Sequence, residues 1–455
     1  MIFHRLCCAF ACLVAAFASA QLPGLKQDKP KAAVAPRNAI RGGAYLELGP
    51  VLGDVTSTGA KVWLKSSGDG LLSVVVGREP DLSDREGFKA PKIEAASFFS
   101  ATVRLKELEP ATKYFYAVLM NGELVTPRPY PSFATAPREG TAGRTRFAFV
   151  SCVGYQGFDS AAAWADLATR TNFDTLLLLG DNHYADTTDA TKLFNAMGVQ
   201  RRLPGCEDIG RRVPLYAIWD NHDYSPQPVD KRAPAKAAAL RAFQMLWPNP
   251  AFGEADNPGV YFKFTRGDVD FFMLDGRYHR DPDNAPEDGK KTHLGEKQLA
   301  WLKRELLASK AKVKVLATGG EWQTQSQSAS WASFARERGE LFQFLGDNKI
   351  TGVLLLSGDR HFTAAYQVAG KFIEVTSGPM GSRNVEPKTV PEMFWNGGKT
   401  GKFYCVFDVD TAPESPRVTL EIYRAAEGLA LRREFTWAEV TGEAKIPSLI
   451  RNTGN

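Results

Sequence analysis

The sequence has little net charge, and beyond its N-terminus it has no long apolar run. The formal net charge is +5 over 455 residues. No dense Lys/Arg stripe is interleaved with aromatic residues, which excludes the usual footprint of a nucleic-acid-binding protein. Beyond the N-terminus, no segment is apolar over the ~20 residues that a stable membrane span needs. Internal repeats and heptads are absent as well. With 44% hydrophobic and 24% charged residues, the chain has the composition of a soluble globular protein of about two domains.

The N-terminus, MIFHRLCCAFACLVAAFASAQ, has the layout of a cleaved export signal. It combines one arginine, a short apolar core and the small residues Ala18-Ser19-Ala20 before Gln21. The alternative, a membrane anchor, would need a longer apolar core. We therefore expect a signal peptide over residues 1–20 and a periplasmic or extracellular mature chain. Residues 21–41 are rich in Pro, Ala and Lys, which predicts a flexible linker.

Few cysteines remain after the predicted signal, namely Cys152, Cys206 and Cys405. An odd number in an exported protein leaves at least one thiol without a disulfide partner. Cys206 and Cys405 are candidates for a disulfide in an oxidising compartment, although the sequence alone does not establish the pairing. Any cysteine left over needs a reason to be a free thiol.

The first folded region, residues 42–138, is predicted to be a β-sandwich. Short alternating apolar runs such as GAKVWLKSS and KYFYAVLMNG are separated there by Gly, Pro, Asn and Asp. The stretch LEPATKY at 108–114 resembles the corner before the sixth strand of fibronectin type III domains, and Trp63 is a candidate core residue. This resemblance predicts a fold and not a function.

The second region, residues 144–435, alternates strand-like and helical segments. Runs such as FDTLLLLGD and ITGVLLLSGDRH predict buried strands, and residues 159–170, 295–309 and 330–345 predict helices. The helix GEKQLAWLKRELL has its apolar residues at helical spacing, at Leu299, Leu302, Leu306 and Leu307. The alternation predicts an α/β layered core. Residues 436–455 are assigned to a C-terminal tail, polar and disordered from residue 442.

Side chains of metal-ligand type follow four of the predicted strands. They are Cys152, Asp181 with Tyr184, Asn221 with His222, and Asp359 with His361. One carboxylate at a strand end can simply cap the next helix, but four polar strand ends in succession are hard to explain in that way. Because open α/β sheets bind ligands beyond the carboxyl ends of their strands, we expect these side chains to form one site.

The candidate ligands divide into two sets by their chemistry. The cysteine, tyrosine and His361 side chains suit a transition metal, whereas Asn221 and Asp359 offer only oxygen, which suits Ca²⁺, Mg²⁺ or Mn²⁺. Asp181 can bridge both sets. A pair of cations about 3.5–4 Å apart would stabilise the attacking and leaving oxygens of a phosphoryl displacement. The residues therefore predict a two-metal site.

The motifs that carry these residues resemble those of the metallophosphoesterases. GDNHY at 180–184, WDNHD at 219–223 and SGDRH at 357–361 occur in the order of the GDxxx, GNHD/E and GHxH blocks. Three departures from these blocks resemble the alkaline phosphatase D family of exported phosphodiesterases and phosphomonoesterases. They are SCVG at 151–154 in place of DxH, the Trp-Asp before Asn-His, and GDRH in place of GHxH. LDGR at 274–277 and the N-terminal β-sandwich fit the same family. The resemblance implies a sandwich of two sheets flanked by helices.

This resemblance also implies the metals and the substrate class. It implies one Fe³⁺ held by Cys152, Asp181, Tyr184 and His361, and one or more Ca²⁺ ions, or another divalent cation, held by Asp181, Asn221 and Asp359. The expected reaction is hydrolysis of small-molecule or lipid phosphate esters by metal-activated hydroxide, without a phospho-enzyme. The family usually carries aspartate where this chain has Asn221, which removes one carboxylate from the second metal.

Three further residues have candidate catalytic or binding roles. His222 is the candidate general acid for the leaving alkoxide, because imidazole transfers protons near neutrality. Arg277 and Arg360 are candidates for binding phosphate oxygens, and each has an alternative pairing with Asp275 or Asp220.

Alternative interpretations remain open at this point. A purple acid phosphatase shares a tyrosine three residues after the bridging aspartate and a fibronectin-like front domain. Against it, residues 312–325 contain no histidine and no GHxH motif occurs. A degenerate extracellular binding protein would have lost ligands, but each position of the two-metal set is filled. Cys152 as a covalent nucleophile would need a lowered thiol pKa, which carboxylate-rich surroundings oppose.

Overall fold

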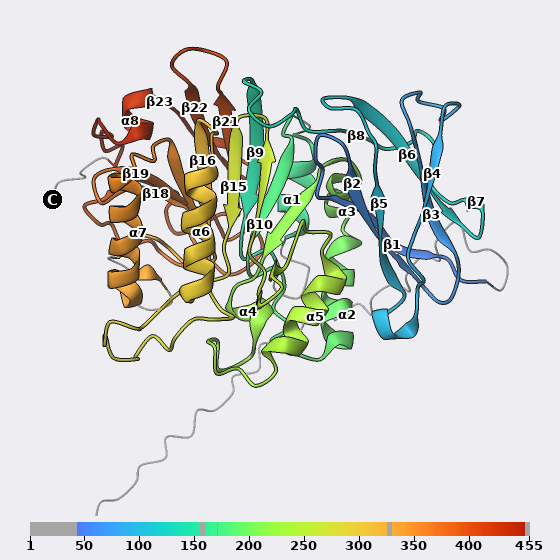
Figure 1. Ribbon diagram of the computed structural model, residues 1–455, viewed down its shortest axis with the longest axis horizontal. Coiled ribbons are helices and arrows are strands. Elements are labelled where there is room, and N and C mark those ends of the chain that lie inside the picture. Colours follow the sequence, from blue (N-terminus) through green and yellow to red (C-terminus); the bar gives the residue numbers. More distant parts are fainter. Residues whose placement is uncertain (1–42, 155–159, 171, 325–329, 451–455) are drawn as a thin grey trace, which may run out of the picture.

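The computed structural model of the protein describes residues 43–154, 160–170, 172–324 and 330–450 (Figure 1). It contains an N-terminal β domain and a larger α/β domain, which lie side by side in Figure 1. The predicted signal and linker, residues 1–20 and 21–41, lie outside the described residues. In the described part of the chain, no helix has the length and apolar character needed to cross a membrane.

Two antiparallel sheets form the N-terminal domain. One sheet has the order β1-β2-β5, and the other has the order β4-β3-β6-β7 with β8 paired to β6. The strands are β1 (Leu46–Gly53), β2 (Ala60–Ser66), β3 (Leu72–Gly77), β4 (Glu86–Lys89), β5 (Ser100–Leu105), β6 (Lys113–Met120), β7 (Glu123–Leu124) and β8 (Ser132–Ala134). Their inner faces share a core that includes Val62, Leu64, Val74 and Tyr116. The predicted strands are present, and the two sheets face each other as in a β-sandwich.

Two residues of this domain test the fibronectin-like expectation in detail. The Glu109 backbone N–H donates to Tyr114 Oη (2.9 Å) at the start of β6, a contact of the tyrosine-corner kind. Trp63 is a buried core residue, as expected, and it belongs to the core shared with the α/β domain. Its Nε1 donates to the Met245 carbonyl (2.7 Å), and its ring packs against Arg201. Strand alternation explains this placement, because its neighbours Val62 and Leu64 occupy the inner face of the sandwich. The fibronectin assignment itself stays a prediction.

Two sheets also form the centre of the α/β domain. The first has the order β11-β10-β9-β21-β22-β23, and the second has the order β14-β15-β16-β17-β19-β18-β20. The first comprises β9 (Arg144–Val150), β10 (Thr175–Leu179), β11 (Leu215–Ile218), β21 (Phe403–Asp410), β22 (Arg417–Arg424) and β23 (Gly428–Phe435). The second comprises β14 (Phe262–Arg266), β15 (Val269–Met273), β16 (Val313–Ala317), β17 (Val353–Ser357), β18 (Ala364–Val368), β19 (Phe372–Thr376) and β20 (Met393–Asn396). Strands β9, β10 and β11 are parallel, as are β15, β16, β17 and β19.

The apolar strand runs are explained by burial on both faces. In β15, Phe271 belongs to the core between the two sheets, and its ring meets Phe147 of β9 edge to face (5.0 Å). Phe272 of the same strand points to the opposite side, into the core under the helices. This covering on both sides confirms the layered α/β prediction.

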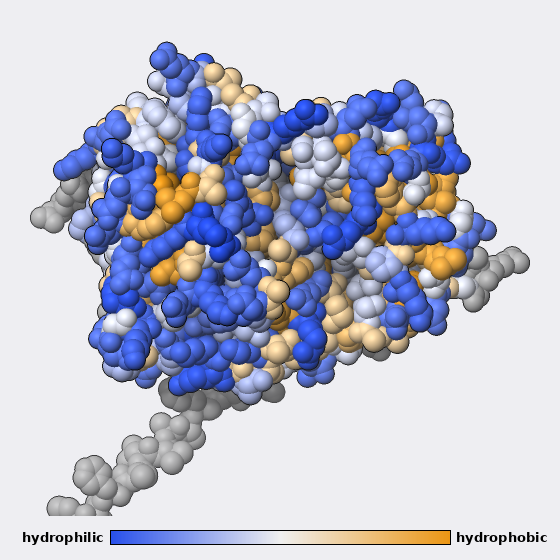
Figure 2. Space-filling model, in the orientation of Figure 1, coloured by the Kyte–Doolittle hydropathy of each residue, from blue (hydrophilic) through white to orange (hydrophobic). Residues whose placement is uncertain are grey.

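Helices flank the two sheets, some on their outer faces and others at the ends of their strands (Figure 1). They are α1 (Ala161–Ala168), α2 (Ala190–Arg201), α3 (Pro204–Arg212), α4 (Asn221–Tyr224), α5 (Lys236–Leu246), α6 (Glu296–Ala308), α7 (Ala335–Asp347) and α8 (Trp437–Thr441). Helices α1 and α6 confirm two of the three predicted segments. The third, 330–345, begins with the 3₁₀ turn Trp331–Phe334 and continues as α7. On α6, Trp301 is buried and Leu307 is 57% exposed, so Leu307 does not belong to the buried face. Figure 2 shows hydrophilic side chains over most of this side of the molecule, with smaller apolar areas between them.

The C-terminal segment differs from the predicted disordered tail. Thr436 caps α8, and Val440 packs into the main core. Gln367 of β18 then binds the segment on both sides, donating to the Ala444 carbonyl (2.8 Å) and accepting from the Ile446 N–H (3.0 Å). The prediction overlooked the Thr-x-x-Glu capping box, which starts a helix with its own apolar face.

The three cysteines of the described chain are free and buried. Cys206 lies on α3, and Cys405 lies within β21, opposite Phe149 of β9. The candidate disulfide between Cys206 and Cys405 is therefore not formed. Each thiol packs as a small apolar group in the core.

Candidate metal site

The predicted ligands follow β9, β10, β11 and β17, directly beyond the carboxyl ends of these strands. Cys152 (φ 51°), Asp181 (φ 52°), Asp359 (φ 69°) and His361 (φ 57°) all have left-handed backbone conformations. A residue other than glycine held in this conformation costs of order 1–3 kcal/mol, and such residues concentrate at functional sites. The chain thus turns sharply off each strand, and the side chains meet at a shared edge of the two sheets.

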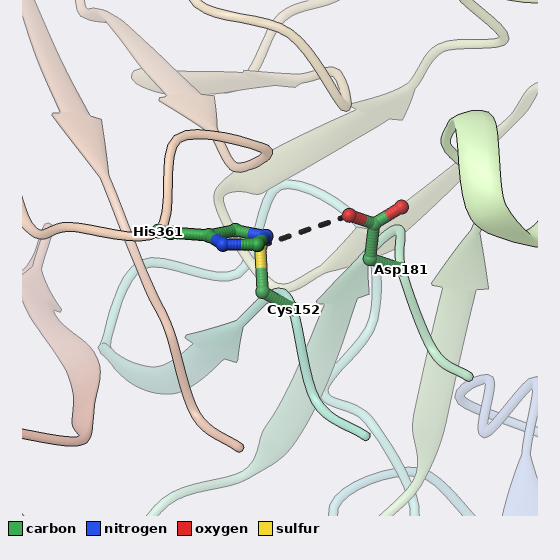
Figure 3. A group of neighbouring side chains, drawn as sticks. All are labelled: Cys152, Asp181 and His361. Atoms are coloured by element: carbon green, nitrogen blue, oxygen red, sulfur yellow. Dashed lines mark hydrogen bonds between the residues drawn. The ribbon is translucent and has the colours of Figure 1, made fainter. Parts of the chain in front are cut away.

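Three donors form the centre of the site (Figure 3). Cys152 Sγ, a carboxylate oxygen of Asp181 and a ring nitrogen of His361 all lie within 4.8 Å of one another. The thiol contacts Asp181 Oδ2 at 3.9 Å. Cys152 and Asp181 are almost completely buried. Sulfur, oxygen and nitrogen donors at this spacing fit a transition metal.

Tyr184 adds a fourth donor to the same cluster. Its Oη lies 3.2 Å from Asp181 Oδ2 and 3.0 Å from His361 Nε2. The four residues expected to surround the first metal are therefore brought together from the ends of three strands.

Of the residues expected at the second metal, Asn221 lies next to a residue that contacts Asp181. Asp181 Oδ1 accepts from the His222 N–H (3.3 Å), which brings the start of α4 to this carboxylate. Asn221 Oδ1, on the first residue of α4, is buried without a hydrogen-bond partner. Since buried amide oxygens are normally satisfied, an unpartnered oxygen beside carboxylates fits a hard cation with oxygen ligands.

The pKa shifts of the candidate ligands also fit the binding of cations. Burial, and then the neighbouring Asp220 and Asp359, raise the Asp181 pKa well above its usual value. Burial and Asp181 likewise raise the Cys152 thiol pKa, while burial, followed by Arg383, lowers the His361 pKa to about 4. The imidazole is therefore neutral and able to ligate, whereas the thiol loses its proton only when a cation replaces it. This also disfavours Cys152 as a free nucleophile.

His222 lies at the mouth of this cluster. Its Nδ1 lies 2.5 Å from Asp186 Oδ1, and its ring packs 4.2 Å from the Tyr184 ring. The side chain is 29% exposed. Asp186 fixes the imidazole orientation, which leaves Nε2 available to another group.

The two candidate phosphate-binding arginines have different surroundings. Arg277 Nε donates to Asp220 Oδ1 (2.6 Å), and both side chains are 2% exposed. Arg360 is 22% exposed, with Nε 3.2 Å from Glu321 Oε2 and Nη1 3.6 Å from Asp359 Oδ2. Of the pairings considered from the sequence, Arg277 with Asp220 is present.

Asp223 is a residue of the site that the sequence reasoning missed. Its carboxylate accepts from the backbone N–H groups of Asn182 (3.0 Å) and Asp220 (3.1 Å), and so joins the two ligand-bearing loops. Gly180 permits this approach, because a Cβ there would lie 2.5 Å from Asp220 Cβ. The spacing of Asp220 and Asp223, typical of a helix-start capping box, was the available signal.

The fold is of the metallophosphoesterase type. A solved structure described as PhoD superposes with a TM-score of 0.70 at 19% identity, covering 86% of this chain and 92% of that chain. A purple acid phosphatase from yellow lupin (Lupinus luteus) gives 0.63 at 15% identity, covering 85% and 74%. At these identities the likeness concerns the fold alone.

Sequence comparison then finds similarity to the family that the motifs resemble. Residues 201–400 match the model of the PhoD-like phosphatase family. Alkaline phosphatase D of Bacillus subtilis (strain 168) is 25% identical, with 63% of this chain and 57% of that protein covered. The match thus spans a little over half the length of this curated relative. Residues 43–138 match the model of a domain of unknown function (DUF7800).

Proposed function

We propose that the protein is an exported, metal-dependent phosphoric ester hydrolase with alkaline phosphatase D-like phosphodiesterase and phosphomonoesterase activity. The observation that carries this proposal is the convergence of thiol, carboxylate, phenol and imidazole donors within 4.8 Å or hydrogen-bonding distance of one another. The PhoD-like family match, which includes Asn221, Asp359 and His361 within residues 201–400, supports it.

The two predicted ligand sets would hold different metals. Cys152, Asp181, Tyr184 and His361 would hold Fe³⁺, while Asp181, Asn221 and Asp359 would hold Ca²⁺ or another divalent cation. When bound, such cations stabilise negative charge on phosphoryl oxygens and lower the pKa of water at the site. The positive charge would also relieve the mutual repulsion that raises the pKa of Asp181.

The chain's own residues would bind the ester and move a proton. Arg360 is the arginine favoured for phosphate, since part of its guanidinium is exposed while Arg277 is buried against Asp220. His222 would donate a proton from Nε2 to the departing alkoxide, with Nδ1 held by Asp186. Burial of Cys152 and Asp181 keeps bulk water away from the reacting groups.

Two alternatives make different predictions. A purple acid phosphatase would need an additional histidine near the end of β16, where this chain has Thr318-Gly319-Gly320-Glu321, and would not use a cysteine ligand. A degenerate binding protein would hold no metal and cleave no ester. The filled donor set favours the hydrolase over the binding protein.

The proposal is tested by measuring hydrolysis of bis-p-nitrophenyl phosphate and p-nitrophenyl phosphate with protein purified without chelator. Asp181→Asn should lose metal and both activities while staying folded, because it removes the carboxylate between the two sets. Asp268→Asn is the matched control, since this buried aspartate caps the Lys312 N–H (2.9 Å) at the opposite ends of the strands. Full activity of Asp181→Asn, or no turnover by the parent after Fe and Ca²⁺ addition, would contradict the proposal.

A further inference from the structure

Glu321 is a buried carboxylate next to Arg360, and none of the predicted roles uses it. It follows β16 and is 0% exposed. Its Oε2 lies 3.2 Å from Arg360 Nε. The Nε–H is not directed at this oxygen, so the contact is an ion pair between a buried carboxylate and a partly exposed guanidinium.

Surrounding hydrogen bonds hold the Glu321 carboxylate in place. Oε1 accepts from Tyr366 Oη (2.9 Å) and Thr376 Oγ1 (3.2 Å), and Oε2 accepts from Gln323 Nε2 (2.9 Å). All these partners lie in the core of the second sheet or at its end. Because hydrogen bonds fix both carboxylate oxygens, Glu321 does not move with Arg360. It can therefore hold the Arg360 guanidinium in place.

A second buried carboxylate extends this network. Ser357 Oγ donates to Glu374 Oε1 (2.6 Å) and also contacts Thr376 Oγ1 (2.7 Å), which bonds to Glu321. Burial, and then Glu321, raise the Glu374 pKa to about 8. Ser357 and Thr376 thus link the two carboxylates, with Glu374 at the end of the network away from Arg360.

Two carboxylates compete for the Arg360 guanidinium. Asp359 Oδ2 lies 3.6 Å from Nη1, and Glu321 Oε2 lies 3.2 Å from Nε. Without Glu321, the guanidinium would be drawn onto Asp359 alone, because an arginine pairs readily with a carboxylate through two parallel contacts. Such a pair would occupy both a predicted metal ligand and the predicted phosphate-binding group.

We propose that Glu321 is a positioning residue that limits Arg360 to a single long contact with Asp359 Oδ2, so that the guanidinium faces substrate phosphate and the other Asp359 oxygen stays available to a metal. This inference rests on the proposed function, which makes phosphate the ligand of the metal site. Glu321 itself touches neither substrate nor metal. Its effect reaches the substrate through Arg360.

The test measures inorganic phosphate affinity of the metal-loaded protein by calorimetry, together with KM and kcat for p-nitrophenyl phosphate. Glu321→Gln keeps the shape and removes the charge, and should weaken phosphate binding and raise KM about 3- to 10-fold, with kcat within about twofold. Arg360→Gln should weaken binding about 10- to 100-fold. Glu321→Gln added to Arg360→Gln should have no further effect, since the two act through one contact.

Two further variants complete the design. Glu337→Gln is the matched control. Glu337 is a buried glutamate that accepts hydrogen bonds from the backbone N–H groups of His293 and Leu294, and this variant should leave KM unchanged. Tyr366→Phe removes one bond to Glu321, and should raise KM about 2-fold even if Glu321→Gln does not fold.

The inference is overturned if Glu321→Gln and Tyr366→Phe both leave phosphate affinity unchanged, or if Glu321→Gln weakens binding equally in the Arg360→Gln background. It is also overturned if the parent binds no phosphate. These outcomes are distinct from failure of the proposed function. A parent that binds phosphate in the expected variant pattern but cleaves neither ester would refute hydrolysis and retain the positioning role.

Discussion

Replacing Arg277 with methionine should destabilise the α/β domain strongly. Arg277 and Asp220 are both 2% exposed and are joined at 2.6 Å. Removing one member of a buried ion pair leaves the other charge without compensation and typically costs about 3–5 kcal/mol. Methionine fills a similar volume, so the loss should arise mainly from charge. We expect Arg277→Met to lower the free energy of unfolding by about 3–5 kcal/mol.

The size of this effect should depend on metal. Asp181 and Asp359 also interact with Arg277, and together with Asp220 they outweigh the opposing effect of burial and raise the pKa of this arginine. Bound cations would take over part of the compensation that Arg277 supplies to these carboxylates. The destabilisation should therefore be larger in chelator-treated protein than in protein saturated with Fe and Ca²⁺.

The assay is urea unfolding followed by tryptophan fluorescence at near-neutral pH, with and without chelator. Asp220→Asn added to Arg277→Met is the matched variant, because it removes the remaining charge of the pair. This double variant should recover more than about half of the lost stability, since replacing both members of a buried pair is often close to neutral. The reasoning would be refuted if Arg277→Met changed stability by less than about 1 kcal/mol, or if the double variant were no more stable than the single one.

Two other predictions follow from the buried ionisable groups. Burial raises the pKa of Glu374 to about 8 and that of Asp223 to about 7. The folded protein therefore keeps protons that the unfolded chain has released, and chelator-treated protein should lose roughly 1–2 kcal/mol of stability between about pH 6.5 and 9. The buried histidines have lowered pKa values in the folded protein, so they act with the opposite sign and only at the lower edge of this window, where the unfolded histidines lose their protons near pH 6.5. Urea midpoints that stay constant across the window would contradict this expectation. Separately, Cys152→Ser should lower the iron content measured by atomic spectrometry, whereas Cys206→Ser, at a buried thiol outside the cluster, should retain it. Equal iron in both variants would remove Cys152 from the ligand set.

The ligand-bearing strand ends were predictable because their signal is local. The leucines of β10 are typical of a strand buried on both faces, and Asp181 follows them after Gly180. Parallel strands place their carboxyl ends at one edge of the sheet. Residues far apart in sequence, such as Cys152 and His361, could therefore be predicted to lie close together. The structure does place these side chains within ligand distance of one another.

The partners of those residues were not predictable, because each contact joins separate elements. Nothing near Arg360 in the sequence indicates Glu321, which lies on a different strand end. Trp63 is buried as expected, but its contact with the α/β domain was not predictable, because alternation alone does not say which face of a strand meets another domain. The order of the segment after α8 was missed for a related reason, since Ala444 and Ile446 are bound by Gln367 in a distant strand.

The balance of charge around the site supports the two-metal proposal independently of any motif. Four buried or nearly buried carboxylates, those of Asp181, Asp220, Asp223 and Asp359, gather at the strand ends. Arg277 and Arg360 contact only two of them directly. An uncompensated cluster of this kind is costly in a buried site, and the raised pKa values of Asp181 and Asp359 express that cost. The left-handed backbone conformations of Asp181 and Asp359 lower the stability of the fold further, in addition to the repulsion between the carboxylates. Cations bound between these groups would recover much of that stability, and for this reason we expect metal binding and folding stability to rise together in this protein.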